Sequence, residues 1–202
     1  MNTKDMFLTM EANDIKQFKW WVDSSFNAHW DSKGHSGRSG TLGKGAIISS
    51  SQKQKVNAGS STESELIGGS DALSDVVWSR YFLLEQGYNV EPSILYQDNE
   101  STIKLLNNGR RSSKRTKHIN NRFFAVHGKI KEGEIEVEYC PTATMWADGL
   151  TKPLQGKMFE DFRNHLMNPE DSIDEGVCCE NPNTSTGERR ECMDEGQPPG
   201  RG

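Results

Sequence analysis

The sequence predicts an α/β domain in which a five-stranded mixed sheet is flanked by helices, followed by a disordered acidic tail. Three short strand-like segments precede the first long helical pattern, which indicates an antiparallel meander at the start of the sheet. Strand and helix patterns then alternate along the chain. Residues 169–202 contain nine Asp or Glu against three Lys or Arg among many Pro, Gly, Ser, Thr and Asn residues. This composition is typical of disorder.

The three N-terminal strands are expected between residues 17 and 58. Residues 17–22 (QFKWWV) form a strand pattern that leads directly into Asp23. Residues 26–45 contain five glycines and are expected to form a loop. Residues 45–50 (GAIISS) predict the second strand, and residues 55–58 predict a weaker third strand. A carboxylate is therefore expected at the end of the first strand.

A long helix is predicted over residues 62–86. Thr62 and Glu65 have the spacing of a capping box, and Gly87 ends the pattern. At 100° per residue the apolar arc comprises Leu66, Gly69, Leu73, Val76 and Leu84. Glu65 lies at the edge of this arc, and Glu63 points elsewhere. Since both acids are candidates for a site on this helix, we choose Glu65, which borders the packed face.

A buried strand over residues 93–97 (SILYQ) ends at Asp98 and is followed by a short helix over residues 100–108. Near the C-terminus, residues 134–141 (EIEVEYCP) alternate as a strand. Thr144 is a possible cap for a final helix that carries Asp148. Pro153 interrupts that helix, and residues 158–166 resume it. Two further carboxylates thus stand beside predicted elements.

The segment from residue 110 to residue 131 has eight Lys or Arg and no Asp or Glu. Apolar residues recur within it at helical spacing, and Arg115, His118, Arg122 and Lys129 form a basic stripe. We therefore expect an amphipathic helix with positive charge facing outward. Such a surface suits nucleic acid, because phosphate groups release counterions to Lys and Arg.

Four acids distributed over strands and helices can converge in the folded chain. Magnesium and manganese prefer carboxylate oxygens, and a pair of such ions stabilises the attacking and leaving oxygens in phosphodiester cleavage. A cluster of four carboxylates would suit such a pair of ions. Each acid taken singly is more often a cap or a solvated surface charge.

Several strings resemble one family when taken in order. They are VDSSFNAHWD, SSTESELIGGSDAL, ILYQDNESTIKLL, RTKHINNRFFAVHGKIKEGEIEVEYC and ADGLTKPL. The chain resembles the ribonuclease H domain of copia-type LTR retrotransposon polyproteins, from about residue 18 to residue 166. The resemblance implies a ribonuclease H-like fold over residues 17–167, with residues 1–16 as a leader from a longer polyprotein and residues 168–202 as the tail.

The resemblance also implies hydrolysis of the RNA strand in RNA–DNA hybrids during reverse transcription. It implies two Mg²⁺ or Mn²⁺ ions per active site and a reverse transcriptase domain as partner in the same polyprotein. The expected setting is the cytoplasm, in virus-like particles where the element is active. The implied catalytic and metal-binding residues are Asp23, Glu65, Asp98 and Asp148. The expected nucleic-acid contacts are Arg115, Lys117, His118, Arg122 and Lys129.

Two other function classes stay open. One is a catalytically inactive, decayed module that still binds hybrids, against which the intact set of four acids argues. The other is a transposase-like strand-transfer enzyme, which would use another order of acids and usually adds DNA-binding domains. The sequence has no window of 18 continuous apolar residues and no cysteine spacing typical of a zinc site. Membrane-spanning and zinc-binding classes are therefore not expected.

Overall fold

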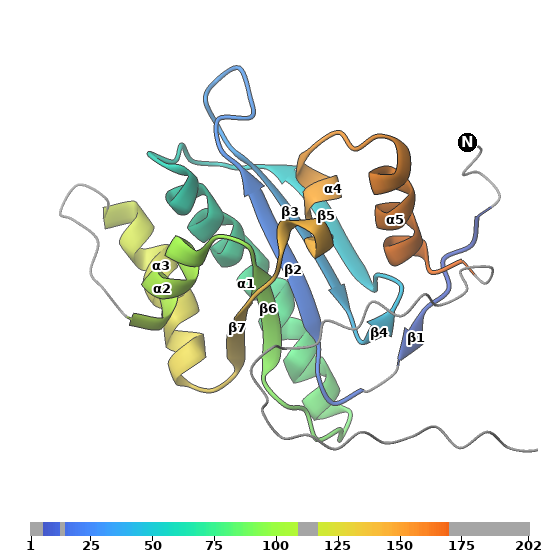
Figure 1. The fold of residues 1–202 in the computed structure, drawn as a ribbon. Coiled ribbons are helices and arrows are strands. Elements are labelled where there is room, and N and C mark those ends of the chain that lie inside the picture. Colours follow the sequence, from blue (N-terminus) through green and yellow to red (C-terminus); the bar gives the residue numbers. More distant parts are fainter. Residues whose placement is uncertain (1–5, 13–14, 109–116, 170–202) are drawn as a thin grey trace, which may run out of the picture. The chain divides into compact units, whose positions relative to one another are not determined.

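A five-stranded mixed sheet forms the centre of the computed structural model, which describes residues 6–12, 15–108 and 117–169. The strand order is β5-β3-β2-β6-β7 (Figure 1). Strands β2, β3 and β5 are antiparallel neighbours, whereas β6 runs parallel to both β2 and β7. The bounds are β2 Lys19–Ser25, β3 His35–Thr41, β5 Ile48–Lys53, β6 Ser93–Gln97 and β7 Ile135–Tyr139. The predicted mixed sheet with three antiparallel strands at its start is confirmed.

The meander differs in detail from the expectation. Strand β3 lies within residues 26–45, where five glycines had predicted a loop, and residues 55–58 form no strand. Two of those glycines serve packing instead. A Cβ on Gly37 would stand 2.7 Å from the Leu150 Cβ, and one on Gly40 would stand 2.7 Å from the Trp20 ring. Glycine in this strand therefore allows close approach from each face of the sheet.

Helix α1 (Ser61–Glu85) covers one face of the sheet and buries Ala72, Val76 and Leu83 against Trp20 and Val22. Leu84, which we had expected on the packed arc, is exposed. Helices α2 (Glu100–Asn108) and α3 (Lys117–Lys131) pack beside α1. Leu106 of α2 and Phe123 and Val126 of α3 join Leu66 of α1 in a second apolar cluster.

The opposite face of the sheet is covered by the C-terminal elements. These are a 3₁₀ helix η1 (Thr142–Thr144), helix α4 (Asp148–Thr151) and helix α5 (Gly156–Met167). Trp21 on this face contacts His165 of α5, with ring centroids 5.0 Å apart. Thr144 ends η1 and caps no helix, so that expectation was wrong.

Residues near the N-terminus form a separate two-stranded sheet, in which β1 (Glu11–Ala12) pairs with β4 (Gly43–Lys44). The Thr9 N–H also donates to the Met167 carbonyl oxygen at 2.8 Å. The acidic tail from residue 170 onward lies outside the described residues. Within the described part of the chain, no helix combines the length and apolar character needed to cross a membrane.

Candidate active site

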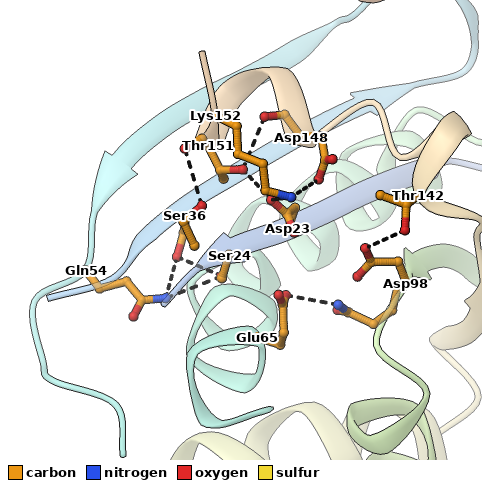
Figure 2. Close-up of polar contacts among 12 residues, drawn as sticks. Asp23, Ser24, Ser36, Gln54, Glu65, Asp98, Thr142, Asp148, Thr151 and Lys152 are labelled. Atoms are coloured by element: carbon orange, nitrogen blue, oxygen red, sulfur yellow. Dashed lines mark hydrogen bonds and ion pairs between the residues drawn. The ribbon is translucent and has the colours of Figure 1, made fainter. Parts of the chain in front are cut away.

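Three aspartates meet at one end of the sheet. Asp23 lies in β2, Asp98 directly follows β6, and Asp148 is the first residue of α4. Each offers a carboxylate oxygen, and these oxygens all lie within 4.8 Å of one another. Because β2 and β6 are parallel neighbours, their C-terminal ends bring Asp23 and Asp98 together, and α4 adds Asp148 from above (Figure 2). Strand β2 continues two residues beyond Asp23, so this acid is within the strand and not at its end.

Glu65 of α1 is the fourth acid at this end of the sheet. Its side chain is buried, and its Oε2 accepts a hydrogen bond from the Gln97 amide at 3.0 Å. Helix α1 approaches β2 closely here, since a Cβ on Gly68 would stand 2.2 Å from the Ser24 Oγ. Burial, together with the negative charge of Asp23, raises the pKa of Glu65 to about 9.

Glu63 has a different role from Glu65. The N-cap of α1 is Ser60, whose hydroxyl accepts the Glu63 N–H at 3.2 Å. The Glu63 carboxylate in turn accepts the Gly59 N–H at 2.6 Å. The capping arrangement therefore begins two residues before the Thr62–Glu65 pair that the sequence suggested. Glu63 stabilises the start of the helix, and Glu65 faces the aspartates.

The electrostatic environment at the aspartates favours a cation. Burial and the charge of Asp23 raise the pKa of Asp98, and burial foremost raises the pKa of Asp148. Carboxylates held this close repel one another unless positive charge stands among them. The Thr142 hydroxyl donates a hydrogen bond to Asp98 at 3.4 Å, which helps to orient that carboxylate.

A lysine that sequence reasoning did not place in the site supplies part of this charge. The Lys152 Nζ lies 2.8 Å from the Asp148 Oδ1 and 3.8 Å from the Asp23 Oδ2 (Figure 2). The neighbouring Thr151 hydroxyl donates to Asp23. The one available signal was the four-residue spacing of Asp148 and Lys152, which is also the spacing of an ordinary helical ion pair.

A buried polar network supports the site from the α1 side of the sheet. The Gln54 amide donates to Ser36 Oγ at 2.9 Å, to the Ser64 carbonyl oxygen at 2.9 Å and to Ser24 Oγ at 3.3 Å. These contacts join the end of β5 to β2, β3 and the first turn of α1. Figure 2 shows the contacts of Gln54 with Ser24 and Ser36. Ser64 precedes Glu65 and Ser24 follows Asp23 in the sequence. These contacts therefore help to fix the position of Glu65 relative to Asp23.

The donor set fits a hard divalent cation. Three carboxylates from separate elements converge, and carboxylate oxygens are the ligands that Mg²⁺ and Mn²⁺ prefer. Glu65 lies outside this group of three, and its Oε2 accepts a hydrogen bond from Gln97, which precedes Asp98. Burial and the charge of Asp23 raise the pKa values of Glu65, Asp98 and Asp148, and a bound cation would favour the ionised form of each carboxyl group.

The basic helix is only partly described. Arg115 lies outside the described residues, as do the side chains of Lys117 and His118. Arg122 forms an ion pair with Asp71 of α1. The Lys129 Nζ lies 2.8 Å from the Glu132 Oε2 and 3.2 Å from the Glu134 Oε2. Within the described part, Arg122 and Lys129 are thus engaged by acids of the same chain.

Comparison with known proteins places these observations in a family context. No protein-family model matches the sequence. Over 120 residues the chain is 32% identical to the retrovirus-related Pol polyprotein from transposon TNT 1-94 of Nicotiana tabacum, covering 59% of this chain and 9% of that protein. Over 126 residues it is 34% identical to the retrovirus-related Pol polyprotein from transposon RE2 of Arabidopsis thaliana, covering 62% of this chain and 9% of that protein. The chain therefore spans less than a tenth of the length of these relatives.

Among solved structures, LC11-RNase H1, isolated from compost, matches with a TM-score of 0.51 at 17% identity, covering 67% of this chain and 93% of that protein. The likeness confirms the expected fold. The sequence matches confirm the expected relationship to retrotransposon polyproteins. The chain has the ribonuclease H fold and is similar in sequence to retrovirus-related Pol polyproteins of plant transposons.

Proposed function

We propose that this chain is a metal-dependent ribonuclease H that hydrolyses the RNA strand of RNA–DNA hybrids. The observation that carries the proposal is the convergence of Asp23, Asp98 and Asp148, with carboxylate oxygens within 4.8 Å of one another, beside the buried Glu65. Acids that serve only as caps or surface charges have no reason to meet from three separate elements. The ribonuclease H fold supports the same chemistry.

The four acids would hold two Mg²⁺ or Mn²⁺ ions. Two such ions stabilise both the attacking and the leaving oxygen of a phosphodiester when bound. The protein contributes orientation and a partly dry setting. Gln97 and Thr142 hold Glu65 and Asp98 by donated hydrogen bonds, and Thr151 holds Asp23. Since these hydrogen bonds form within the protein, they orient the carboxylates before the substrate binds.

We propose that the basic segment, residues 110–131, holds the hybrid through its phosphates. The expected contacts are Arg115, Lys117, His118, Arg122 and Lys129. Arg122 and Lys129 already pair with acids of the chain, so their contribution requires exchange of these partners. Arg115, Lys117 and His118 complete the proposed set of contacts. Such contacts follow the backbone and shape of the duplex without selecting bases.

The proposed setting is reverse transcription of a retrotransposon. The curated relatives are named as Pol polyproteins, and we propose that the chain acts beside a reverse transcriptase domain of such a polyprotein. The proposed location is the cytoplasm, within virus-like particles of an active element. We also propose the division given by the resemblance, in which residues 17–167 form the ribonuclease H-like domain between a leader and a tail.

The test is cleavage of an end-labelled RNA–DNA hybrid by the purified chain with Mg²⁺ or Mn²⁺, beside RNA and DNA duplexes. Asp98→Asn removes one metal ligand and is expected to abolish cleavage while hybrid binding persists. Asp161→Asn is the matched control, because it removes the same charge from α5, where Asp161 pairs with Lys157. Its cleavage rate should equal that of the wild type.

Three results would overturn the proposal. Cleavage that survives in Asp98→Asn would show that the acid cluster is not the active site. Cutting or joining of DNA would favour a strand-transfer enzyme. Salt-sensitive hybrid binding without cleavage would identify the chain as an inactive binding module.

A further inference from the structure

We propose that Lys152 is a built-in counter-cation that competes with divalent metal for the aspartates of the active site. This inference rests on the metal-binding part of the proposed function and adds a residue outside the expected ligand set. Its basis is the position of the Lys152 ammonium group, 2.8 Å from Asp148 and 3.8 Å from Asp23 (Figure 2). Asp23 and Asp148 are two of the three residues whose oxygens form the candidate metal group.

The backbone from which the Lys152 side chain starts is fixed by packing. Its backbone N–H donates to the Asp148 carbonyl oxygen at 2.8 Å, which closes the turn of α4. Helix α4 is seated on β3, where Gly37 leaves room for Leu150 and Ala147. The Ser51 hydroxyl also donates to the Leu150 carbonyl oxygen at 2.6 Å. The lysine stem therefore starts from an anchored turn beside the aspartates.

The charge relation makes the ammonium group a competitor of metal. Three carboxylates whose oxygens lie within 4.8 Å of one another repel each other when ionised, and the single positive charge of Lys152 reduces this repulsion. The Lys152 ammonium group donates to the Asp148 Oδ1 at 2.8 Å, so it holds a carboxylate that belongs to the candidate metal group. Two cations that bind the same oxygens lower each other's affinity by the same factor. The Lys152 side chain is 45% exposed, so the ammonium group can leave for water when metal enters.

The removal of this competitor has two opposite consequences. In Lys152→Met the carboxylates lose their internal cation, so the protein should melt at a lower temperature in chelator than the wild type. The same change should tighten the binding of Mn²⁺ by about fivefold or more, the lower end of typical coupling between sites. A purely structural ion pair would give the loss in melting temperature without the gain in affinity.

The experiment is calorimetric titration of the full chain with Mn²⁺, together with melting curves in EDTA and in excess Mn²⁺. Lys157→Met is the matched control, because Lys157 pairs with Asp161 on the exposed side of α5. It removes the same unit of charge and should leave both readouts at wild-type values. Lys152→Gln provides a second variant with a polar head group, should Lys152→Met fail to fold in both conditions.

Tighter Mn²⁺ binding in the Lys152 variants, with Lys157→Met unchanged, supports the inference. Unchanged or weaker Mn²⁺ binding in folded Lys152 variants overturns the inference. An equal gain in Mn²⁺ affinity in Lys152→Met and Lys157→Met would be a general charge effect and also overturns it. Hybrid cleavage by the wild type is scored separately. Cleavage without the affinity gain refutes only the role of Lys152, whereas absence of Mn²⁺ binding in every chain refutes this inference together with the metal site.

Discussion

Replacement of Glu65 by Gln should stabilise the protein in chelator, by an amount that grows with pH. The pKa of Glu65 rises from 4.5 to about 9 through burial and through the charge of Asp23. Between these values the unfolded chain has lost the Glu65 proton, whereas the folded protein keeps it. Ionisation therefore favours unfolding as the pH rises. At about 1.4 kcal/mol per pH unit, the cost over the interval from 4.5 to pH 7 is about 3 kcal/mol.

Gln is neutral at every pH and can still accept the hydrogen bond that the Gln97 amide donates. The measurement is urea unfolding in EDTA at pH 5, 6, 7 and 8, for the wild type and Glu65→Gln. The free energy of unfolding of the variant should exceed that of the wild type by less than about 1 kcal/mol at pH 5 and by about 3 kcal/mol at pH 7. Raised pKa values at Asp98 and Asp148 give the same trend in both proteins, so the difference isolates Glu65.

Glu63→Gln is the matched control on the same helix. It removes a carboxylate from the exposed cap, where Glu63 accepts the Gly59 N–H. This variant should lose about 0.5–1 kcal/mol and gain stability at no pH. A difference between Glu65→Gln and the wild type that stays constant from pH 5 to pH 8 would refute the reasoning, because Glu65 would then be ionised in the folded protein.

Two further predictions concern the packing around the site. Burial lowers the pKa of His165 to about 4, so stability should fall as the pH drops from 6.5 towards 4, by no more than about 2 kcal/mol at pH 5. His165→Phe keeps an aromatic ring between Trp21 and Trp146 and should flatten this loss in urea unfolding at pH 5 and 7; an equal loss in the variant would contradict the assignment. Gly68→Ala places a Cβ 2.2 Å from the Ser24 Oγ and should cost about 1–3 kcal/mol. Ser24→Ala in the same chain leaves that Cβ 3.6 Å from the Ser24 Cβ and should recover part of the loss, so simple additivity of the two changes would exclude this contact as the cause.

Several elements could be predicted from local sequence because a local cause forms them. The strand Ser93–Gln97 and the helix Glu100–Asn108 have the predicted bounds. An apolar run forms the first, and an Asn99 carboxamide that accepts the Ser101 and Thr102 N–H groups starts the second. The choice of Glu65 over Glu63 likewise followed from helical periodicity. In the structure Glu65 is 6% exposed, whereas Glu63 accepts the Gly59 N–H at the start of the helix.

Other features depended on tertiary contacts that no local pattern contains. Strand β3 was missed because Gly37 and Gly40 resemble loop residues, although they are needed there for the approach of α4 and Trp20. Thr144 seemed a helix cap, but the chain turns through η1 and starts α4 without a side-chain cap. For β3, long-range packing outweighs the local propensity.

The sequence by itself determined which acids are available, which elements carry them and which face of α1 carries Glu65, because hydrophobic periodicity and strand ends are local properties. Only the tertiary structure decided that Asp23, Asp98 and Asp148 meet within 4.8 Å. That meeting depends on the parallel pairing of β2 with β6 and on the seating of α4 over Gly37. The same packing brings Lys152 to Asp23, 129 positions earlier in the chain, and converts an ordinary helical ion pair into part of the site.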